Sequence, residues 1–179
     1  MIKKRSGQEQ KDIKTVAGKI LSYISKHPGV HFNDLQRALD LAFGTLQYHL
    51  NQMERKNKII VLRKEYKTLY FPPAFRDPIN QKIMIFLRQR IPRALILNLL
   101  EHSEKPGHEL TQLLKITKST LSYYTSRLEK LGILKIKVVG REKLYSVNRP
   151  ERVAKLLSVY RKSFGDELVD RFVELWVRI

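Results

Sequence analysis

A stretch of eleven residues occurs twice in the chain, at positions that lie 75 residues apart. The first copy reads GTLQYHLNQME from Gly44, and the second reads STLSYYTSRLE from Ser119. The similarity at this offset runs without a gap from Leu35 to Tyr70 of the first copy. A match of this length indicates a repeated structural unit and not two unrelated amphipathic helices. The sequence therefore predicts two copies of a unit of about 60 residues, followed by a tail.

The second copy shows which elements each unit contains. Apolar residues at helical spacing predict one helix before SEKPG and a second helix with Leu110, Leu113 and Leu114 on its buried side. A third helix begins after Thr117, whose hydroxyl is a good N-cap. Alternating apolar and basic residues over 134–138 predict a strand, and a glycine turn leads to a return strand. Three helices with a tight turn and a basic hairpin define a winged helix-turn-helix.

The first copy predicts the same elements, and the prolines after it mark a boundary. Ala42 replaces the N-cap Thr117, and Asn57 replaces Gly132 after the third helix. The predicted fold class is mainly α with small β-hairpins (α+β), with two tandem winged helix-turn-helix domains plus C-terminal amphipathic helices. The predicted domains are an N-terminal winged-helix domain at 1–78, a linker helix and second winged-helix domain at 79–149, and a C-terminal helical dimerisation segment at 150–179.

Positive charge is concentrated in the two copies. The whole chain has a net charge of +18, and residues 1–78 carry 15 Lys and Arg against 7 Asp and Glu. Residues 79–150 carry 14 basic and 5 acidic residues, whereas residues 151–179 carry 6 and 5. Basic repeats favour a polyanion as partner, and the nearly neutral apolar tail favours a protein partner.

Several classes of function are not expected from this sequence. The chain has no cysteine, and its five histidines show no ligand spacing, so we expect no disulfide, metal or cofactor. No phosphate loop, nucleophile motif or carboxylate pair indicates an enzyme. The N-terminal residues lack a signal-peptide pattern, and the apolar runs are too short to span a bilayer. We therefore expect a cytoplasmic, nucleoid-associated protein without a membrane partner.

Three segments carry a resemblance to a known group. TLQYHLNQMERKNKI, TLSYYTSRLEKLGIL and the closing VDRFVELW are similar to archaeal transcription regulators with tandem winged helix-turn-helix domains, and more broadly to the ArsR-like winged-helix superfamily. The resemblance implies binding of double-stranded DNA. It also implies a homodimer, because a terminal helix commonly joins two copies in these regulators.

The outward faces of the third helices are the expected DNA-binding surfaces, because this helix enters the major groove. In the second copy Leu121, Tyr124, Leu128 and Leu131 predict the buried stripe. The amides of Gln47 and Asn51 suit adenine. The predicted DNA-binding residues on the helices are Phe43, Gly44, Gln47, Tyr48 and Asn51 in the first copy, and Lys118, Ser119, Ser122, Tyr123 and Ser126 in the second. The predicted phosphate or minor-groove contacts of the wings are Arg63, Lys64, Lys67, Arg141 and Lys143.

Apolar residues at helical spacing also mark the tail. A stripe of this size is either covered by the chain's own domains or meets a second copy, and the sequence favours a homodimer. The predicted dimerisation residues are Val153, Leu156, Leu157, Tyr160, Phe164, Leu168, Phe172, Leu175 and Trp176.

The leading hypothesis is a sequence-specific double-stranded DNA-binding transcription regulator that acts by promoter occupancy. Two other functions remain open. One is a winged-helix protein-interaction module of the basal transcription machinery, with RNA polymerase or basal factors as partners. The other is a nonspecific architectural DNA-binding protein.

Overall fold

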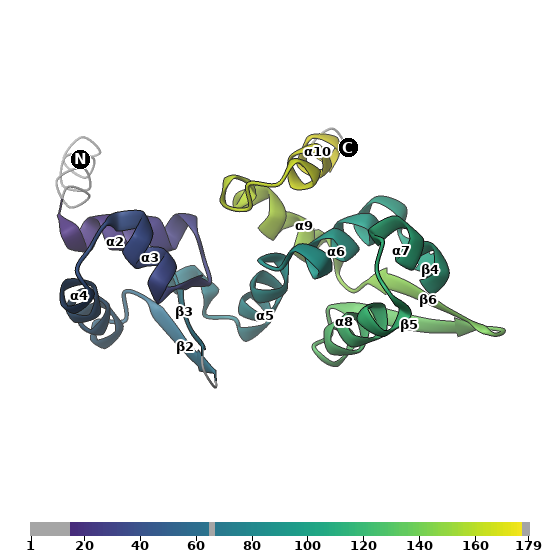
Figure 1. Ribbon diagram of the computed structural model, residues 1–179, viewed down its shortest axis with the longest axis horizontal. Helices are drawn as coiled ribbons and strands as arrows, with labels where there is room; N and C mark the ends of the chain where they lie inside the picture. The colour runs from purple at the N-terminus through teal and green to yellow at the C-terminus, as the bar shows by residue number, and fades with distance from the viewer. Residues whose placement is uncertain (1–14, 65–66, 177–179) are drawn as a thin grey trace. The chain divides into compact units, whose positions relative to one another are not determined.

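The computed structural model describes residues 15–64 and 67–176 (Figure 1), and the chain divides into two compact units, Met1–Gln81 and Lys82–Ile179. Each unit combines helices with one small antiparallel sheet. The predicted fold class is therefore confirmed: the chain is mainly α, with two winged helix-turn-helix domains. Helices follow the second domain, as predicted.

In the described residues of the first unit, three helices and three strands follow one another in winged-helix order. The elements are α2 (Val16–Lys26), β1 (Val30–His31), α3 (Phe32–Leu39), α4 (Phe43–Arg55), β2 (Ile60–Lys64) and β3 (Lys67–Phe71). A 3-10 turn, η1 (Pro73–Phe75), and the helix α5 (Pro78–Leu87) follow. Helix α5 corresponds to the predicted linker helix.

The second unit repeats this order and adds the helices of the tail. Its elements are α6 (Arg90–His102), β4 (Glu104–Pro106), α7 (Gly107–Leu114), α8 (Lys118–Lys130), β5 (Leu134–Val139), β6 (Glu142–Val147), α9 (Pro150–Val159), η2 (Arg161–Ser163) and α10 (Glu167–Trp176). Helices α7 and α8 begin and end 75 residues after α3 and α4, which is the offset of the sequence similarity.

Each sheet has a third strand that the sequence pattern did not predict. The strand orders are β1-β3-β2 and β4-β6-β5, and every pairing is antiparallel. The added strands are very short, and Val30 in β1 pairs with Tyr70 in β3. A two- or three-residue strand has no visible alternation, so a pattern search reads it as loop. The strand ties the segment before α3 or α7 to the return strand of the wing.

The third helices α4 and α8, which we call the recognition helices, are each anchored by a narrow buried stripe. In α4 the buried residues are Leu46, Leu50 and Met53, as the sequence predicts. They pack into a cluster of the first unit that includes Ile20 and Ile24 of α2. Because α4 buries residues at spacings of four and three, its opposite face turns to solvent.

The predicted stripe of α8 is partly wrong. Leu121 and Leu128 are buried, but the third member is Thr125, whose side chain is only 2% exposed, while Tyr124 and Leu131 are half-buried. The Thr125 hydroxyl donates to the carbonyl of Leu121 at 2.9 Å. This back-bond satisfies the hydroxyl inside the helix and allows a polar residue at a buried position.

One position of the preceding helix was also predicted wrongly. Leu113 in α7 is 54% exposed, and its counterpart Ala38 in α3 is exposed as well. Only Leu110 of α7 is fully buried, while Leu114 is half-buried. Helix α7 has only eight residues and buries Leu110. Its buried stripe is therefore narrower than the i, i+3, i+4 pattern predicts, and Leu113 lies outside it.

Both recognition helices end in the same left-handed turn. Asn57 and Gly132 have φ values of 52° and 69°. The N–H groups of Lys58 and Ile133 donate to the carbonyls of Met53 and Leu128 at 2.8 Å, which satisfies two carbonyls at the helix ends. Asparagine tolerates this conformation, so the predicted replacement of glycine is accommodated. The turn leads from the recognition helix into the first strand of the wing.

The caps of the recognition helices give a matched pair of stability predictions. The Thr117 hydroxyl accepts from the N–H of Thr120 at 3.1 Å, whereas Ala42 has no side-chain cap. We expect Thr117→Ala to lower the unfolding free energy of the second unit by about 1 kcal/mol. Ala42→Thr should raise that of the first unit by up to about 1 kcal/mol. Urea unfolding of both variants checks this, and an unchanged midpoint for Thr117→Ala would contradict it.

Candidate nucleic-acid interface

The outward face of α4 is uncharged and carries two exposed aromatic rings. Phe43 is 62% exposed and Tyr48 is 61% exposed. The Phe43 ring rests against that of Phe32, with 5.0 Å between the centroids. Gln47 is half-buried, and its Nε2 donates to Oδ1 of the exposed Asn51 at 2.9 Å. The two amides predicted to contact adenine are therefore joined to each other.

The outward face of α8 is small and polar at its start. Lys118, Ser119, Ser122 and Ser126 are exposed, and Tyr123 is 53% exposed. The Ser119 hydroxyl lies 2.9 Å from that of Thr117, so it belongs to the N-terminal cap. The structure thus brings the predicted helix residues of each copy onto one outward face. Contact with DNA remains a prediction for all of them.

Arg127 of α8 is a candidate residue that the sequence reasoning missed. Its guanidinium carbon lies 5.1 Å from the centre of the Tyr123 ring, and its NH1 donates to the Tyr123 hydroxyl. The spacing of four residues between an aromatic residue and an arginine on one helix is the signal that could have revealed the pair. At the matching positions, α4 has Tyr48 and the uncharged Gln52.

The wing of the first unit is tied to its recognition helix. Both terminal nitrogens of Arg63 in β2 donate to the two carboxylate oxygens of Glu54 in α4, each at 2.6 Å. This bidentate bond holds the pKa of the Glu54 carboxyl below its usual value, although partial burial opposes the shift. Arg63 was predicted as a phosphate contact, and here its charge is balanced by Glu54.

The first wing also carries two lysines at its end. Lys64 pairs with Lys67 at the end of the hairpin, and the Lys67 side chain is exposed. In the second copy, Glu129 and Val138 stand at the positions of Glu54 and Arg63, so the ion pair has no counterpart there.

The second wing projects beyond the helices of its unit (Figure 1). Arg141 and Lys143 near its tip are exposed, as predicted for phosphate contacts. Val138 is 66% exposed, although the alternation predicts a half-buried strand through this position. Along β5, Leu134 is buried and Ile136 is half-buried, whereas Val138 and Val139 nearer the turn are exposed. Glu142 near the tip lies 3.4 Å from Nδ1 of His108 in α7.

The tail residues predicted to form a dimer divide into three groups by burial. Val153, Leu156, Leu157 and Phe172 are buried inside the second unit, where α10 packs against α6 and α9. Tyr160 and Phe164 are half-buried. Leu168, Leu175 and Trp176 on α10 are 44%, 52% and 37% exposed. The chain itself therefore covers the first group, and only the last three offer a free apolar surface, which we call the α10 patch.

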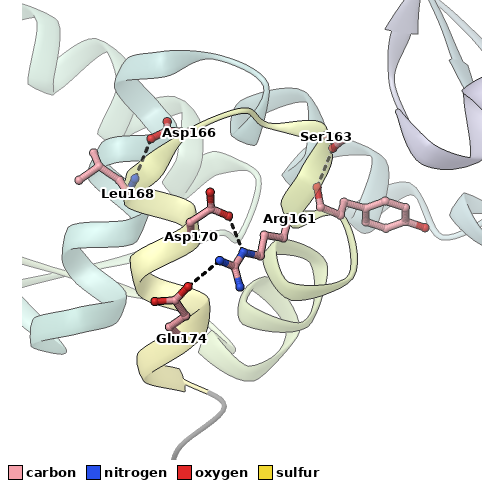
Figure 2. A network of polar contacts seen from close by, with 7 residues as sticks. Arg161, Ser163, Asp166, Leu168, Asp170 and Glu174 are labelled. Carbon is pink, nitrogen blue, oxygen red and sulfur yellow. Dashed lines mark hydrogen bonds and ion pairs between the residues drawn. The ribbon is translucent and has the colours of Figure 1, made fainter.

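Polar contacts hold the turn between α9 and α10 in place (Figure 2). Arg161 in η2 donates to Asp170 and, at 2.8 Å, to Glu174, both of which lie on α10. At the start of α10, Asp166 accepts from the backbone N–H of Leu168 at 3.0 Å. Its other carboxylate oxygen lies 2.6 Å from Arg93 of α6, and both side chains of this pair are largely buried. Asp166, Asp170 and Glu174 are thus engaged by arginines of the same unit.

Phe164 has a role inside the chain. The guanidinium carbons of Arg88 and Arg93 lie 5.6 and 5.8 Å from the centre of its ring. Two cations beside one ring fix the turn between η2 and α10. Phe164 is therefore engaged in the second unit, although it was predicted to contact a second copy.

Within residues 15–64 and 67–176, no group of three or more acidic or histidine side chains could hold a metal ion. No helix in these ranges is long and apolar enough to cross a membrane.

The fold and the two outward recognition helices define a tandem winged helix-turn-helix protein, and comparisons with protein families agree. Residues 14–84 match a family described as "HTH_HVO_0163_N, N-terminal HTH domain". Residues 92–135 match "Bacterial regulatory protein, arsR family". Each match covers one recognition helix. The resemblance to regulators with tandem winged helix-turn-helix domains is confirmed, and the matches support DNA-binding regulation as the general function.

A curated relative shares part of the chain. It is an uncharacterized HTH-type transcriptional regulator of Methanocaldococcus jannaschii, 29% identical over 131 residues. The match covers 72% of this chain but only 32% of the relative, so the chain spans about a third of that protein's length.

Solved structures are similar over about half of the chain. HlyU from Vibrio cholerae is 17% identical with a TM-score of 0.42, and the match covers 49% of this chain and 95% of HlyU. M. tuberculosis Rv0081 is 24% identical with a TM-score of 0.43, covering 52% of this chain and 93% of that one.

The Tyr123–Arg127 pair gives a prediction about charge. Residues in the second half of a recognition helix face the phosphate backbone more than the base edges, so we expect Arg127 to contact a phosphate. Arg127→Ala should weaken binding to all duplexes and reduce the slope of log K against log[salt] by about 0.9. Tyr123→Phe keeps the ring and should cost less affinity. Gln52→Ala at the matching position of α4 is the control, and an unchanged slope for Arg127→Ala would overturn the assignment.

Proposed function

We propose that the protein is a sequence-specific transcription regulator that binds double-stranded DNA through two winged helices per chain. In this proposal residues 1–78 and 79–149 each bind DNA, and residues 150–179 join two copies into a homodimer. The regulator acts in the cytoplasm on the chromosome by occupying a promoter, where it blocks or recruits RNA polymerase.

One observation carries this proposal more than any other. Both recognition helices bury one narrow stripe and leave the opposite face free, with a basic hairpin beside it. A helix of this kind fits the major groove, while the hairpin reaches the adjacent backbone. The chain's net charge of +18 supports a polyanion as the ligand.

The two alternatives make different demands on the same surfaces. An architectural protein needs only charge, because it binds the backbone without reading bases. The amide and aromatic side chains of α4 favour base reading over that function. A module that binds RNA polymerase would use the exposed rings as a protein contact. Selection from genomic fragments identifies a sequence-specific regulator, because only that function enriches a defined site. Retention of RNA polymerase then separates the interaction module from the architectural protein.

Salt dependence tests whether the ligand is a nucleic acid at all. If wings and helices neutralise several phosphates, log K for duplex DNA should fall with log[salt] by about 0.9 per phosphate contact. Titrations at several salt concentrations, monitored by fluorescence anisotropy, measure the slope. A response that stays flat with salt would remove nucleic acid as the ligand.

The α10 patch is the part of the tail that supports a homodimer. Leu168 and Leu175 are seven residues apart and therefore lie on one face of α10. The Trp176 ring packs at a tilt against Phe172, with 5.4 Å between the ring centroids. Two copies of a self-complementary apolar face form a two-fold interface. A dimer would also place four winged helices, two from each chain, on one operator.

A point substitution tests the dimer better than a truncation does. Cutting the chain after Asn148 would remove Val153, Leu157 and Phe172, which the second unit buries. Leu175→Arg instead places a charge on the exposed patch. We expect sedimentation to show a dimer for the unchanged chain and a monomer for this variant, with specific affinity falling more than nonspecific affinity. Ile79→Arg, at an exposed apolar residue of α5, is the control. A monomeric unchanged chain would rule the dimer out.

A further inference from the structure

We infer that the first winged helix reads A·T base pairs, through a ridge formed by Phe43, Gln47 and Asn51. We call these three residues the α4 ridge. The inference rests on the proposed function, since it presumes that α4 enters the major groove. It goes further by assigning a base class to this copy and a separate contact to each side chain.

The ridge is continuous and has no charge. Its residues are four apart, so they follow one line along the outward side of α4. Helix α4 has no lysine or arginine before Arg55 in its last turn. The nearest arginine of the wing, Arg63, is paired with Glu54. Affinity for phosphate therefore has to come from other parts of the protein, and this face is suited to base edges.

The two amides together present a donor next to an acceptor. Gln47 Nε2 donates one of its two N–H groups to Asn51 Oδ1, and this bond leaves Asn51 Nδ2 as a donor and Gln47 Oε1 as an acceptor side by side for a ligand. Adenine offers the complementary pair in the major groove, with N7 as acceptor and the N6 amino group as donor. Guanine offers two acceptors there, so its O6 would face Gln47 Oε1 without a proton between them.

The Phe43 ring completes the match to an A·T pair. A phenyl group that is 62% exposed gains by covering an apolar surface, and the thymine methyl is the apolar group of the major groove. Contact with Phe32 holds the ring at the start of α4. The second copy has Lys118, Ser122 and Ser126 at the three matching positions, which offer neither a ring nor an amide.

The experiment begins with selection of sites from random duplex DNA by the full-length chain. The same selection with Phe43→Ala and with Asn51→Ala should lose A·T preference at one block of positions. In the selected site, deoxyuridine then replaces thymine in that block, which removes only the methyl group. We expect about fourfold weaker binding by the unchanged chain, equal to about 0.8 kcal/mol for one buried carbon, and little change for Phe43→Ala. Replacing adenine by 7-deazaadenine removes N7, and it should weaken the unchanged chain but not Asn51→Ala.

Controls separate the inference from the proposed function. Ile79→Ala removes an exposed apolar side chain from α5 and should keep both the selected site and the sensitivity to deoxyuridine. If a site is enriched but thymine and deoxyuridine duplexes bind equally, the A·T assignment is wrong and the regulator remains. If Phe43→Ala leaves DNA binding unchanged and abolishes retention of RNA polymerase, the ridge is a protein contact and the inference is wrong. If no site is enriched, both the inference and the proposed function fall.

Discussion

The buried stripe of each recognition helix fixes the rotation of that helix about its own axis, and every outward contact depends on that rotation. Successive residues of a helix are 100° apart, so a shift by one residue would bury a different face. In α4 the stripe is Leu46, Leu50 and Met53, and each such side chain contributes about 1.5–3 kcal/mol when buried. This free energy keeps the opposite face of the helix at the surface. It does so even though burial of the exposed aromatic rings would favour another rotation of the helix.

Much of the fold was predictable from the sequence, because each element of the unit occurs in both copies and can be predicted twice. Helices α3, α4, α7 and α8 follow apolar periodicity, and both copies place them at matching positions. Strands β1 and β4 were not predictable, since their short segments show no period and their pairing depends on a distant strand. The local pattern also predicted Leu113 to be buried, although it is exposed, and did not include the buried Thr125 in the stripe of α8.

The candidate site was predictable at the level of faces but not of partners. Periodicity identifies which residues of α4 and α8 point outward, and the structure brings them together as expected. Periodicity does not show that Arg63 pairs with Glu54, because this contact depends on how the wing packs against the helix and not on a local pattern. These pairings differ between the copies, so the two outward faces are chemically distinct in spite of their common fold. Equivalent positions in a repeat therefore need not share a role.

The packing of α10 against α6 has a consequence for the order in which the chain folds during synthesis. The first unit is complete once residue 81 has left the ribosome. This unit can therefore fold while the rest of the chain is being translated. The second unit buries Val153, Val169 and Phe172, and these emerge long after α6. The apolar side of α6 therefore stays partly exposed until residue 172 has been synthesised. During that interval the nascent chain is most exposed to chaperones and to aggregation.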